Sequence, residues 1–287
     1  MRVAALLAGL VLLLSPPARA QSDVSLSDVS VSLSYATTVA GLTVMLTDAD
    51  VEMSPQGYRV DVGSRTAGTY GMLFRGETYS VAQGRWAGGL VAPARFAISG
   101  HWRGKPRRSL IEYQSGVPTI LRMVPSNEEE REAVAPDLQR ETVDTISAAA
   151  RLVRQATQTG RCDGAARTYD GRRLVEISVT TGGWEAMPPG SGGIFAGQAL
   201  RCDFNGRLLA GFMLDGDRAA AARPQKGSAW LARLSPGGPM LPVRLSFDIR
   251  WLGSATMVLT GATSHGAAPL VRTRADAENG AAPLGLP

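Results

Sequence analysis

The alternation of apolar and polar residues predicts β-strands along most of the chain. Apolar residues occupy every second position in 31–35, 42–46 and 58–62, and a period of two is typical of strands with one buried face. Gly- or Pro-containing turns, such as Ser54–Gly57, separate the strands. Further strands are expected at 70–74, 78–82, 94–99, 109–113, 165–169, 172–180, 199–204, 207–213, 241–249 and 255–260.

Three stretches in the second half predict turns or loops. The Asp170-Gly171 pair predicts a hairpin with a type I′ turn. Asn205-Gly206 predicts a second reversal of the chain. The sequence GGWEAMPPGSGG at 182–193 predicts a flexible loop, because glycine and proline disfavour regular structure.

One segment, at about 144–159, has the features of a helix. Asp144 is a suitable N-cap residue, and Gly160 is a natural residue just past the helix end. Between them a narrow apolar stripe at helical spacing is expected to face the sheet. The stripe consists of Ile146, Ala149, Val153 and Ala156.

These elements predict a mainly β fold, either a curved antiparallel meander or an open, barrel-like sheet whose face or mouth the helix covers. We expect one β-rich domain over residues 29–263. Residues 21–28 are polar, and residues 264–287 are rich in Ala, Pro, Gly and charge. Both of these flanking segments are expected to be disordered.

The first twenty residues have the features of a signal peptide. Arg2 precedes an apolar run from Val3 to Leu14, which is short for a membrane span. Ala18-Arg19-Ala20 has the small-x-small form of a signal-peptidase site. We expect cleavage after Ala20 and a periplasmic protein that does not span the membrane, or else a secreted one. A membrane anchor is the alternative for this segment.

The chain has two cysteines, Cys162 and Cys202. Oxidising compartments favour disulfides, so the export signal predicts one structural disulfide between them, joining the end of the helix to a late strand. A catalytic thiol would need a free cysteine. Metal binding is poorly supported, because neither histidine, His101 or His265, lies at ligand spacing from a cysteine.

The charge excludes a typical nucleic-acid-binding protein. The formal net charge is +5, and removal of Arg2 and Arg19 with the signal peptide leaves 28 basic against 25 acidic residues, or +3. This excess is too small for nucleic acid, but it is compatible with weak attraction to anionic lipid or lipopolysaccharide.

Two basic clusters can contact a phosphate or carboxylate group. A solvated rim on an arginine-rich surface is the favoured interpretation of both, and the first is also named as a candidate contact for an anion or lipid. The first cluster is Arg103, Lys105, Arg107 and Arg108, and the second is Arg161, Arg167, Arg172 and Arg173.

No motif for catalysis or cofactor binding stands out, and we expect no cofactor. The acidic run at 125–141 lacks the spacing of a calcium loop and is interpreted as a solvated connector. His101 lies in a Gly- and Arg-rich turn and His265 at the start of the tail, so neither is expected to act as a supported base. Asp215 and Asp217 are interpreted as turn formers.

Several stretches resemble the bacterial exported family catalogued as domain of unknown function 3108. The resemblance covers roughly residues 29–262 and implies a periplasmic β-rich domain with a disulfide. It implies no functional residues, because the family has no assigned activity. The stretches are YATTVAGLTVML at 35–46, GYRVDVGSRTAGTYGMLF at 57–74, VDTISAAARL at 143–152, CDGAARTYDGRR at 162–173, Ala199–Cys202 and Gly211.

Three functions remain open at this point. The first is a non-enzymatic module that binds a hydrophobic or lipid-like component of the cell envelope inside the curved sheet. The second is a structural or interaction protein with a filled core and no ligand. The third, more remote, is a hydrolase, for which a polar cleft holding a histidine and a carboxylate is required.

Overall fold

The computed structural model describes residues 28–190, 192–249 and 253–265, and within them thirteen strands form one antiparallel sheet. The order of the strands is β7-β6-β5-β4-β3-β2-β1-β13-β12-β11-β10-β9-β8. The strands are β1 (Val29–Val39), β2 (Leu42–Met53), β3 (Gly57–Thr66), β4 (Gly76–Ala87), β5 (Leu90–Trp102), β6 (Lys105–Gln114), β7 (Val117–Val124), β8 (Gly164–Tyr169), β9 (Leu174–Met187), β10 (Gly197–Ala210), β11 (Gln225–Arg233), β12 (Met240–Ile249) and β13 (Gly253–Ser264).

Short helical segments connect some of the strands, and α3 is the longest of them. They are α1 (Gly68–Leu73), the 3-10 turn η1 (Asn127–Glu129), α2 (Pro136–Gln139), α3 (Thr145–Thr159) and α4 (Arg218–Ala221). No helix among the described residues has the length and apolar character needed to cross a bilayer.

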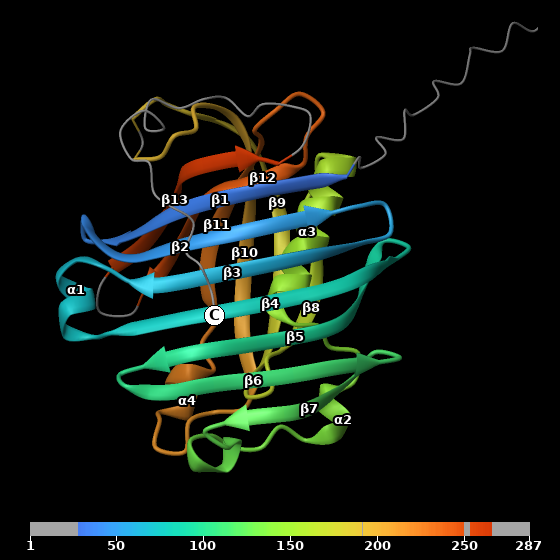
Figure 1. Cartoon of the computed structure of the whole chain (residues 1–287), viewed down its shortest axis with the longest axis vertical. Helices are drawn as coiled ribbons and strands as arrows, with labels where there is room; N and C mark the ends of the chain where they lie inside the picture. Colours follow the sequence, from blue (N-terminus) through green and yellow to red (C-terminus); the bar gives the residue numbers. More distant parts are fainter. Residues whose placement is uncertain (1–27, 191, 250–252, 266–287) are drawn as a thin grey trace, which may run out of the picture.

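The sheet is strongly curved, with the first and last strands, β1 and β13, at its centre. The first strand, β1, pairs with β2 on one side and with the last strand, β13, on the other. Figure 1 shows β1–β7 crossing the front of the molecule, with β9, β10 and β11 behind them at a steep angle. The predicted open, barrel-like antiparallel sheet with one main helix is confirmed.

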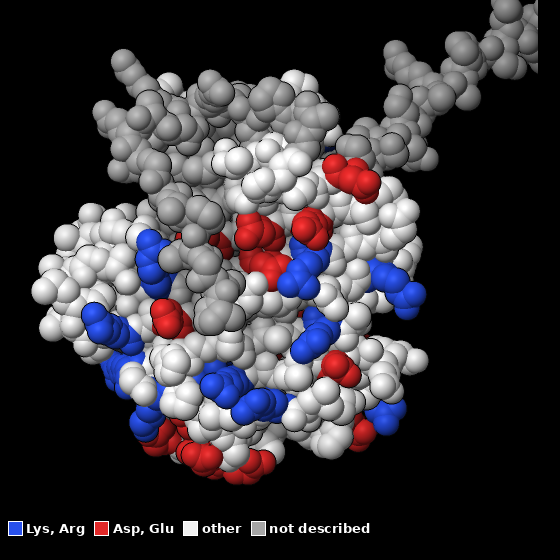
Figure 2. Space-filling view, in the orientation of Figure 1, with Lys and Arg blue, Asp and Glu red and all other residues white. Residues whose placement is uncertain are grey.

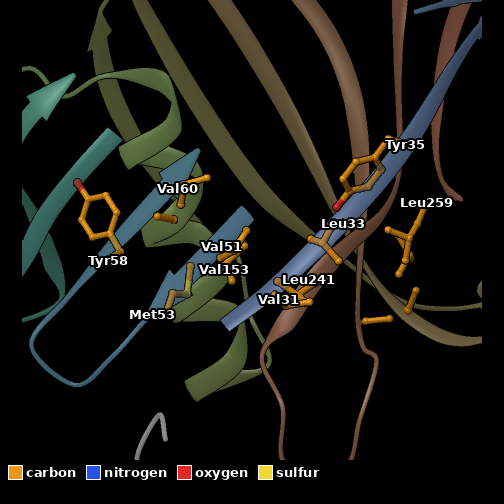
Figure 3. Packing of buried hydrophobic residues seen from close by; sticks show 14 of the residues in the cluster. Val31, Leu33, Tyr35, Val51, Met53, Tyr58, Val60, Val153, Leu241 and Leu259 are labelled. Carbon is orange, nitrogen blue, oxygen red and sulfur yellow. The ribbon is translucent and has the colours of Figure 1, made fainter. Parts of the chain in front are cut away.

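The core lies on the concave face, between this curved sheet and α3. Alternate residues of β1 are buried, and Val31, Leu33 and Tyr35 are 5% exposed or less. Figure 3 shows Val153 of α3 beside side chains of β2 and β3. The predicted period-two strands therefore supply the inner wall of the molecule.

The predicted helix begins and ends where its capping residues indicated. The Asp144 carboxylate accepts a hydrogen bond from the backbone N–H of Ser147 over 2.8 Å, and Gly160 adopts the left-handed conformation with φ of 66°. The expected stripe is partly wrong, because Ala149 is exposed and Ala150 is buried. The hydroxyl of Tyr58 donates to the hydroxyl of Ser147 over 2.6 Å, so the polar side chain in the first turn of the helix faces the sheet.

We expect the buried Asp144 carboxyl to make stability depend on pH. Burial raises the pKa of Asp144 above 3.8, although hydrogen bonds from Ser147 act in the opposite direction. The folded protein therefore holds this proton more tightly than the unfolded chain. The stabilisation that follows is complete below the unfolded pKa and is lost as pH rises through the folded pKa.

The Asp144→Asn variant keeps a cap oxygen but cannot ionise. Denaturant unfolding from pH 3.5 to 8 should show the parent losing stability relative to Asp144→Asn as pH rises above about 4. Asp215→Asn, on an exposed turn, controls for the loss of one negative charge. A parent-to-variant difference that stays constant with pH would contradict the expectation.

The predicted disulfide joins Cys162, just past α3, to Cys202 on β10, with Cα atoms 6.0 Å apart. Both cysteines are fully buried, next to Ala156 of the helix and Leu200 of the same strand. Asp163 fastens the same segment to β9, where it accepts hydrogen bonds from the backbone and hydroxyl of Thr181. Cys162 is thus a structural residue.

Two predicted segments in the first half differ from the structure. Residues 70–74 were expected in a strand but belong mainly to α1, whose turn is closed by hydrogen bonds from Gly71 to Ala67 and from Phe74 to Tyr70. No strand was expected for β7, which contains Pro118. Proline is tolerated there because β7 is an edge strand of the sheet.

Strands β9 and β10 in the second half are longer than expected, because glycines that predicted a loop and a turn lie inside them. The expected loop at 182–193 is strand up to Met187, because β9 stays paired with β10 and accommodates Gly183, with φ of 97°, at a register shift. The expected turn at Asn205-Gly206 lies inside β10, where Gly206 pairs with residues on both sides. No strand was expected for β11.

Two details of the turns also differ. The Asp170-Gly171 hairpin is not a type I′ turn, because four residues separate the closing pair of Tyr169 and Leu174, and of these only Gly171 has positive φ. Strand β13 includes Ser264, which was expected in the tail, and the backbone N–H of His265 donates to Ser30. The expected signal peptide, most of the linker and residues 266–287 of the tail lie outside the described residues.

Candidate functional site

The first predicted basic cluster is divided between different surfaces. The guanidinium of Arg103 lies over the ring of Phe74, 4.9 Å from its centroid, on the outer rim. Lys105 lines a shallow pocket with Glu129. Arg107 and its neighbour Arg108 instead both line a cleft. Arg107 shares the buried face of β6 with Ser109, whereas Arg108 is exposed.

The second predicted cluster is divided in the same way. Arg161 pairs with Asp163, and Arg167 donates to the carbonyl oxygen of Leu138 over 2.7 Å. Arg172 and Arg173 lie in the β8–β9 turn and line the cleft that holds Arg107 and Arg108. The fold thus brings together half of each cluster.

The β8–β9 turn reaches this position because it packs against β6 and β7. The hydroxyl of Ser109 donates to the carbonyl oxygen of Asp170 over 3.4 Å. Gly171 lies so close that a Cβ there would overlap the end of Met123 and lie 3.3 Å from Ile111. A side chain at Gly171 would therefore force the end of Met123 to move, and the φ of 87° at this position also favours glycine.

Glu130 links the two basic clusters. Its carboxylate accepts a 2.5 Å hydrogen bond from Arg107 and lies 3.5 Å from a guanidinium nitrogen of Arg172. The hydrogen bond from Arg107 is the main cause that holds the pKa of Glu130 below its ordinary value. The acidic run was interpreted as a solvated connector, but one of its residues, Glu130, lines the cleft and pairs with Arg107.

Asp170 orients the second pair of arginines. It accepts hydrogen bonds from the backbone N–H groups of Arg172 and Arg173, and two more from the Arg173 guanidinium. Burial alone would raise the pKa of Asp170, but the charge and hydrogen bonds of Arg173 lower it on balance. Asp170 is therefore a carboxylate that fixes the turn.

Arg131 completes the site and was missed by the sequence analysis. Its guanidinium donates to the carbonyl oxygen of Gly211 over 2.7 Å. Burial lowers the pKa of Arg131, and the nearby charge of Arg173 acts in the same direction. Its position among the glutamates of the acidic run could have indicated an ion-pairing role, because a single arginine there can lie close to their carboxylates.

We call this cleft, of about 490 Å³, the arginine cleft. Five arginines and two carboxylates line it, an excess of three positive charges. Arg172 is the most enclosed of the ion-paired arginines, with 14% of its side chain exposed. Four apolar residues, Ile98, Trp102, Val124 and Met213, and the hydroxyl-bearing Thr78 and Ser109 form the rest of the wall.

Each histidine lines a pocket with a carboxylate, His101 with Glu77 and His265 with Glu52, but among the described residues neither lies between a serine and a carboxylate. His101 lies at the end of β5, directly across from Glu77. The ring of His265 is 2.7 Å from the hydroxyl of Ser32, which also donates to Asp50. The serine is therefore the central group, whereas nucleophilic catalysis needs the histidine between serine and carboxylate.

The other candidate groups have local roles. Asp217 caps α4 by accepting from the backbone of Ala220, and Asp215 lies in the preceding turn. Among the described residues, no three His, Cys, Asp or Glu side chains lie close enough together to hold a metal ion.

Comparisons with known proteins give a family and a fold. The model of the family described as "Protein of unknown function (DUF3108)" matches residues 30–260. A search of curated proteins finds no significant match. The crystal structure of a "beta-barrel-like protein of domain of unknown function DUF1849" from Brucella abortus is 14% identical, with a TM-score of 0.51 over 83% of this chain and 99% of that one. At this identity the likeness concerns the fold alone.

Two further solved structures align more loosely. A "putative lipoprotein" from Parabacteroides distasonis is 8% identical over 85% of this chain and 100% of its own, with a TM-score of 0.33. A "putative exported protein with YmcC-like fold" from Bacteroides fragilis is 12% identical over 83% and 98%, with a TM-score of 0.32. Neither alignment is close enough to inform the site.

Proposed function

The chain belongs to the DUF3108 family of proteins of unknown function, as the resemblance indicated, and we propose that it is an exported, non-enzymatic protein of the cell envelope that binds an anionic amphiphile in the arginine cleft. The ligand is a lipid-like molecule with a phosphate or carboxylate head and an apolar body. The signal-peptide pattern supports export to the periplasm, with secretion as the alternative.

The observation that carries this proposal is the convergence of two distant basic segments on one cleft with apolar walls. Arginine binds phosphate and carboxylate in a bidentate manner, and Ile98, Trp102 and Met213 supply surface for an apolar chain. Three excess positive charges in a half-buried site repel one another, and a bound anion would reduce that repulsion.

A ligand-free structural role remains the second candidate. The helix α3 and the side chains of β1–β3 fill the hollow around Val153, as expected for a scaffold. Ile98 packs against the buried cluster that contains Ile111 and also lines the arginine cleft. A binding protein should hold an anionic amphiphile in the arginine cleft, whereas a scaffold should bind none there.

Titration with fluorescent long-chain amphiphiles that carry a phosphate, a carboxylate or a neutral head tests the proposal. The parent should prefer the two anionic probes. In the double variant Arg107→Gln/Arg173→Gln we expect affinity for them to fall about tenfold or more, because charge-assisted hydrogen bonds contribute about 1.5–3 kcal/mol each. Native mass spectrometry of protein taken from the periplasm should show a co-purified anionic lipid.

The control removes the same charge from the outer face. Arg95 and Arg122 are exposed and precede concave-face residues of β5 and β7, so their side chains point away from the cleft. Arg95→Gln/Arg122→Gln should bind like the parent. Equal loss in both double variants, or equal binding of neutral and anionic probes, would refute the cleft as the binding site. A parent that binds none of the probes and carries no lipid would favour the scaffold.

A further inference from the structure

A second surface, at one edge of the molecule, exposes apolar side chains unrelated to the arginine cleft. Leu42 is 62% exposed, Met72 83% and Leu73 76%. We call these three residues the apolar tip. Leu42 begins β2, and Met72 and Leu73 end α1. Figure 1 shows α1 and the β1–β2 turn projecting together at the left edge.

The fold holds the apolar tip in place and directs it outward. The backbone N–H of Ala67, just before α1, donates to Val44 of β2. Behind the tip, the rings of Tyr70 and Phe74 lie 5.1 Å apart, and Arg103 covers Phe74. No residue of α1 is buried. The helix is therefore anchored by its aromatic side, and its two longest aliphatic side chains face solvent.

Basic residues flank the apolar tip. Arg75 follows α1, and its carbonyl oxygen accepts a hydrogen bond from the backbone of Arg103. Neither guanidinium has a carboxylate partner among the described residues, whereas nearby Arg65 lies 3.6 Å from Asp48. Figure 2 shows the projecting edge as uncharged surface with basic residues beside it. Exposed Glu77 is the acidic residue closest along the chain.

We propose that the apolar tip is a membrane-contact site, at which Leu42, Met72 and Leu73 enter the interface of an anionic bilayer while Arg75 and Arg103 contact its headgroups. Apolar side chains that protrude beside cations suit the boundary of a bilayer, where headgroup charge and acyl chains lie within a few ångströms. A protein partner would need roughly 800 Å² of surface, far more than three projecting side chains offer.

This inference is independent of the arginine cleft and changes one sequence-based expectation. Contact with lipid was expected at Arg103, Lys105, Arg107 and Arg108. Arg107 is held by Glu130 inside the cleft, so its charge is not available to a flat surface. Of that predicted cluster, Arg103 lies beside the apolar tip, together with Arg75, which belongs to neither predicted basic cluster.

Flotation with vesicles tests the membrane-contact site. The full chain lacking residues 1–20 should float with phosphatidylglycerol vesicles and far less with phosphatidylcholine vesicles. Leu42→Ser/Met72→Ser/Leu73→Ser should lower the partition coefficient about tenfold or more. Arg75→Gln/Arg103→Gln should lower it about fivefold per charge at low salt, and added salt should reduce that difference.

Matched variants distinguish membrane binding by the apolar tip from nonspecific adsorption through other exposed apolar residues. Leu90 and Leu121 are 55% and 53% exposed elsewhere on the molecule, so Leu90→Ser/Leu121→Ser should float like the parent. The added fluorescence of Met72→Trp should be quenched by brominated lipid tails. Because the three tip residues are exposed, the melting temperature of the triple variant should equal that of the parent.

Three results would overturn the proposal. The first is a parent that does not float with anionic vesicles. The second is equal loss of flotation in the tip and control variants. The third is a parent that self-associates through the tip, seen as a dimer that the triple variant loses, with no quenching of Met72→Trp by lipid. The third result would make the tip a contact between copies of the chain.

Discussion

Removing the disulfide by Cys162→Ala/Cys202→Ala should lower the free energy of unfolding by about 2–5 kcal/mol. The bond closes a separation of 40 residues, so its loss gives the unfolded chain more conformational freedom. For a chain of this size, each kcal/mol corresponds to about 2–4 °C in melting temperature. Alanine is preferable to serine because both positions are fully buried and a hydroxyl there would need a partner.

The local effect should be as informative as the global one. The bond connects the segment after α3 to β10, so its loss should expose the end of the helix to protease while leaving ligand and membrane binding intact. Reduction of the parent should reproduce the melting temperature of the double variant. Two titratable thiols in unfolded protein from the periplasm, or an unchanged melting temperature, would contradict the structural role.

The sequence was most informative where one local rule determined the structure. Alternation placed β1, β2 and β3, because each strand has one face on the core and one in solvent. Asp144 and Gly160 marked the ends of α3, since capping depends on residues within a few positions of the helix end. The cysteine pairing followed from there being two cysteines and an export signal.

The errors arose where a residue pair has two structural uses. Asn205-Gly206 suits a turn, but in β10 it lies between two partner strands, and pairing on both sides outweighs the local preference. Gly183 adopts positive φ inside β9 and accommodates a register shift. A strand with glycine looks like a loop until its partners are known.

The arginine cleft could be predicted in composition but not in geometry. Arg107 and Arg172 were both named as possible anion contacts, yet they are 65 positions apart in the chain. Their approach depends on the curvature of the sheet and on the fit of Gly171 against β6 and β7. Glu130 lies in a run of similar residues, and nothing local distinguishes this half-buried partner of Arg107 from its solvated neighbours.

Gly211 offers the sharpest test of how the cleft is built. Its φ is 79°, and a Cβ there would overlap the carbonyl oxygen of Arg172 and lie 3.0 Å from the Cα of Arg173. Its carbonyl oxygen also holds Arg131. Backbone atoms cannot move aside as a flexible side chain can, so Gly211→Ala must displace either the β8–β9 turn or the end of β10.

We expect Gly211→Ala to destabilise the protein by about 2–4 kcal/mol, combining the strain of positive φ with the clash. Gly237→Ala is the matched control, because Gly237 has φ of 74° and no heavy atom within 4 Å of the added Cβ. Its cost should be about 1 kcal/mol, from backbone strain alone. Denaturant unfolding measures both.

The two variants should also differ in binding. Displacing the turn moves Arg172 and Arg173 away from Glu130, so Gly211→Ala that remains folded should lose affinity for anionic amphiphiles, whereas Gly237→Ala should keep it. Vesicle flotation should stay unchanged in both, because the apolar tip lies on other strands. If Gly211→Ala costs no more stability than Gly237→Ala, the close approach of β10 to the β8–β9 turn is wrong. If the Gly211→Ala variant is destabilised but binds amphiphiles like the parent, the β8–β9 turn is not part of the binding site.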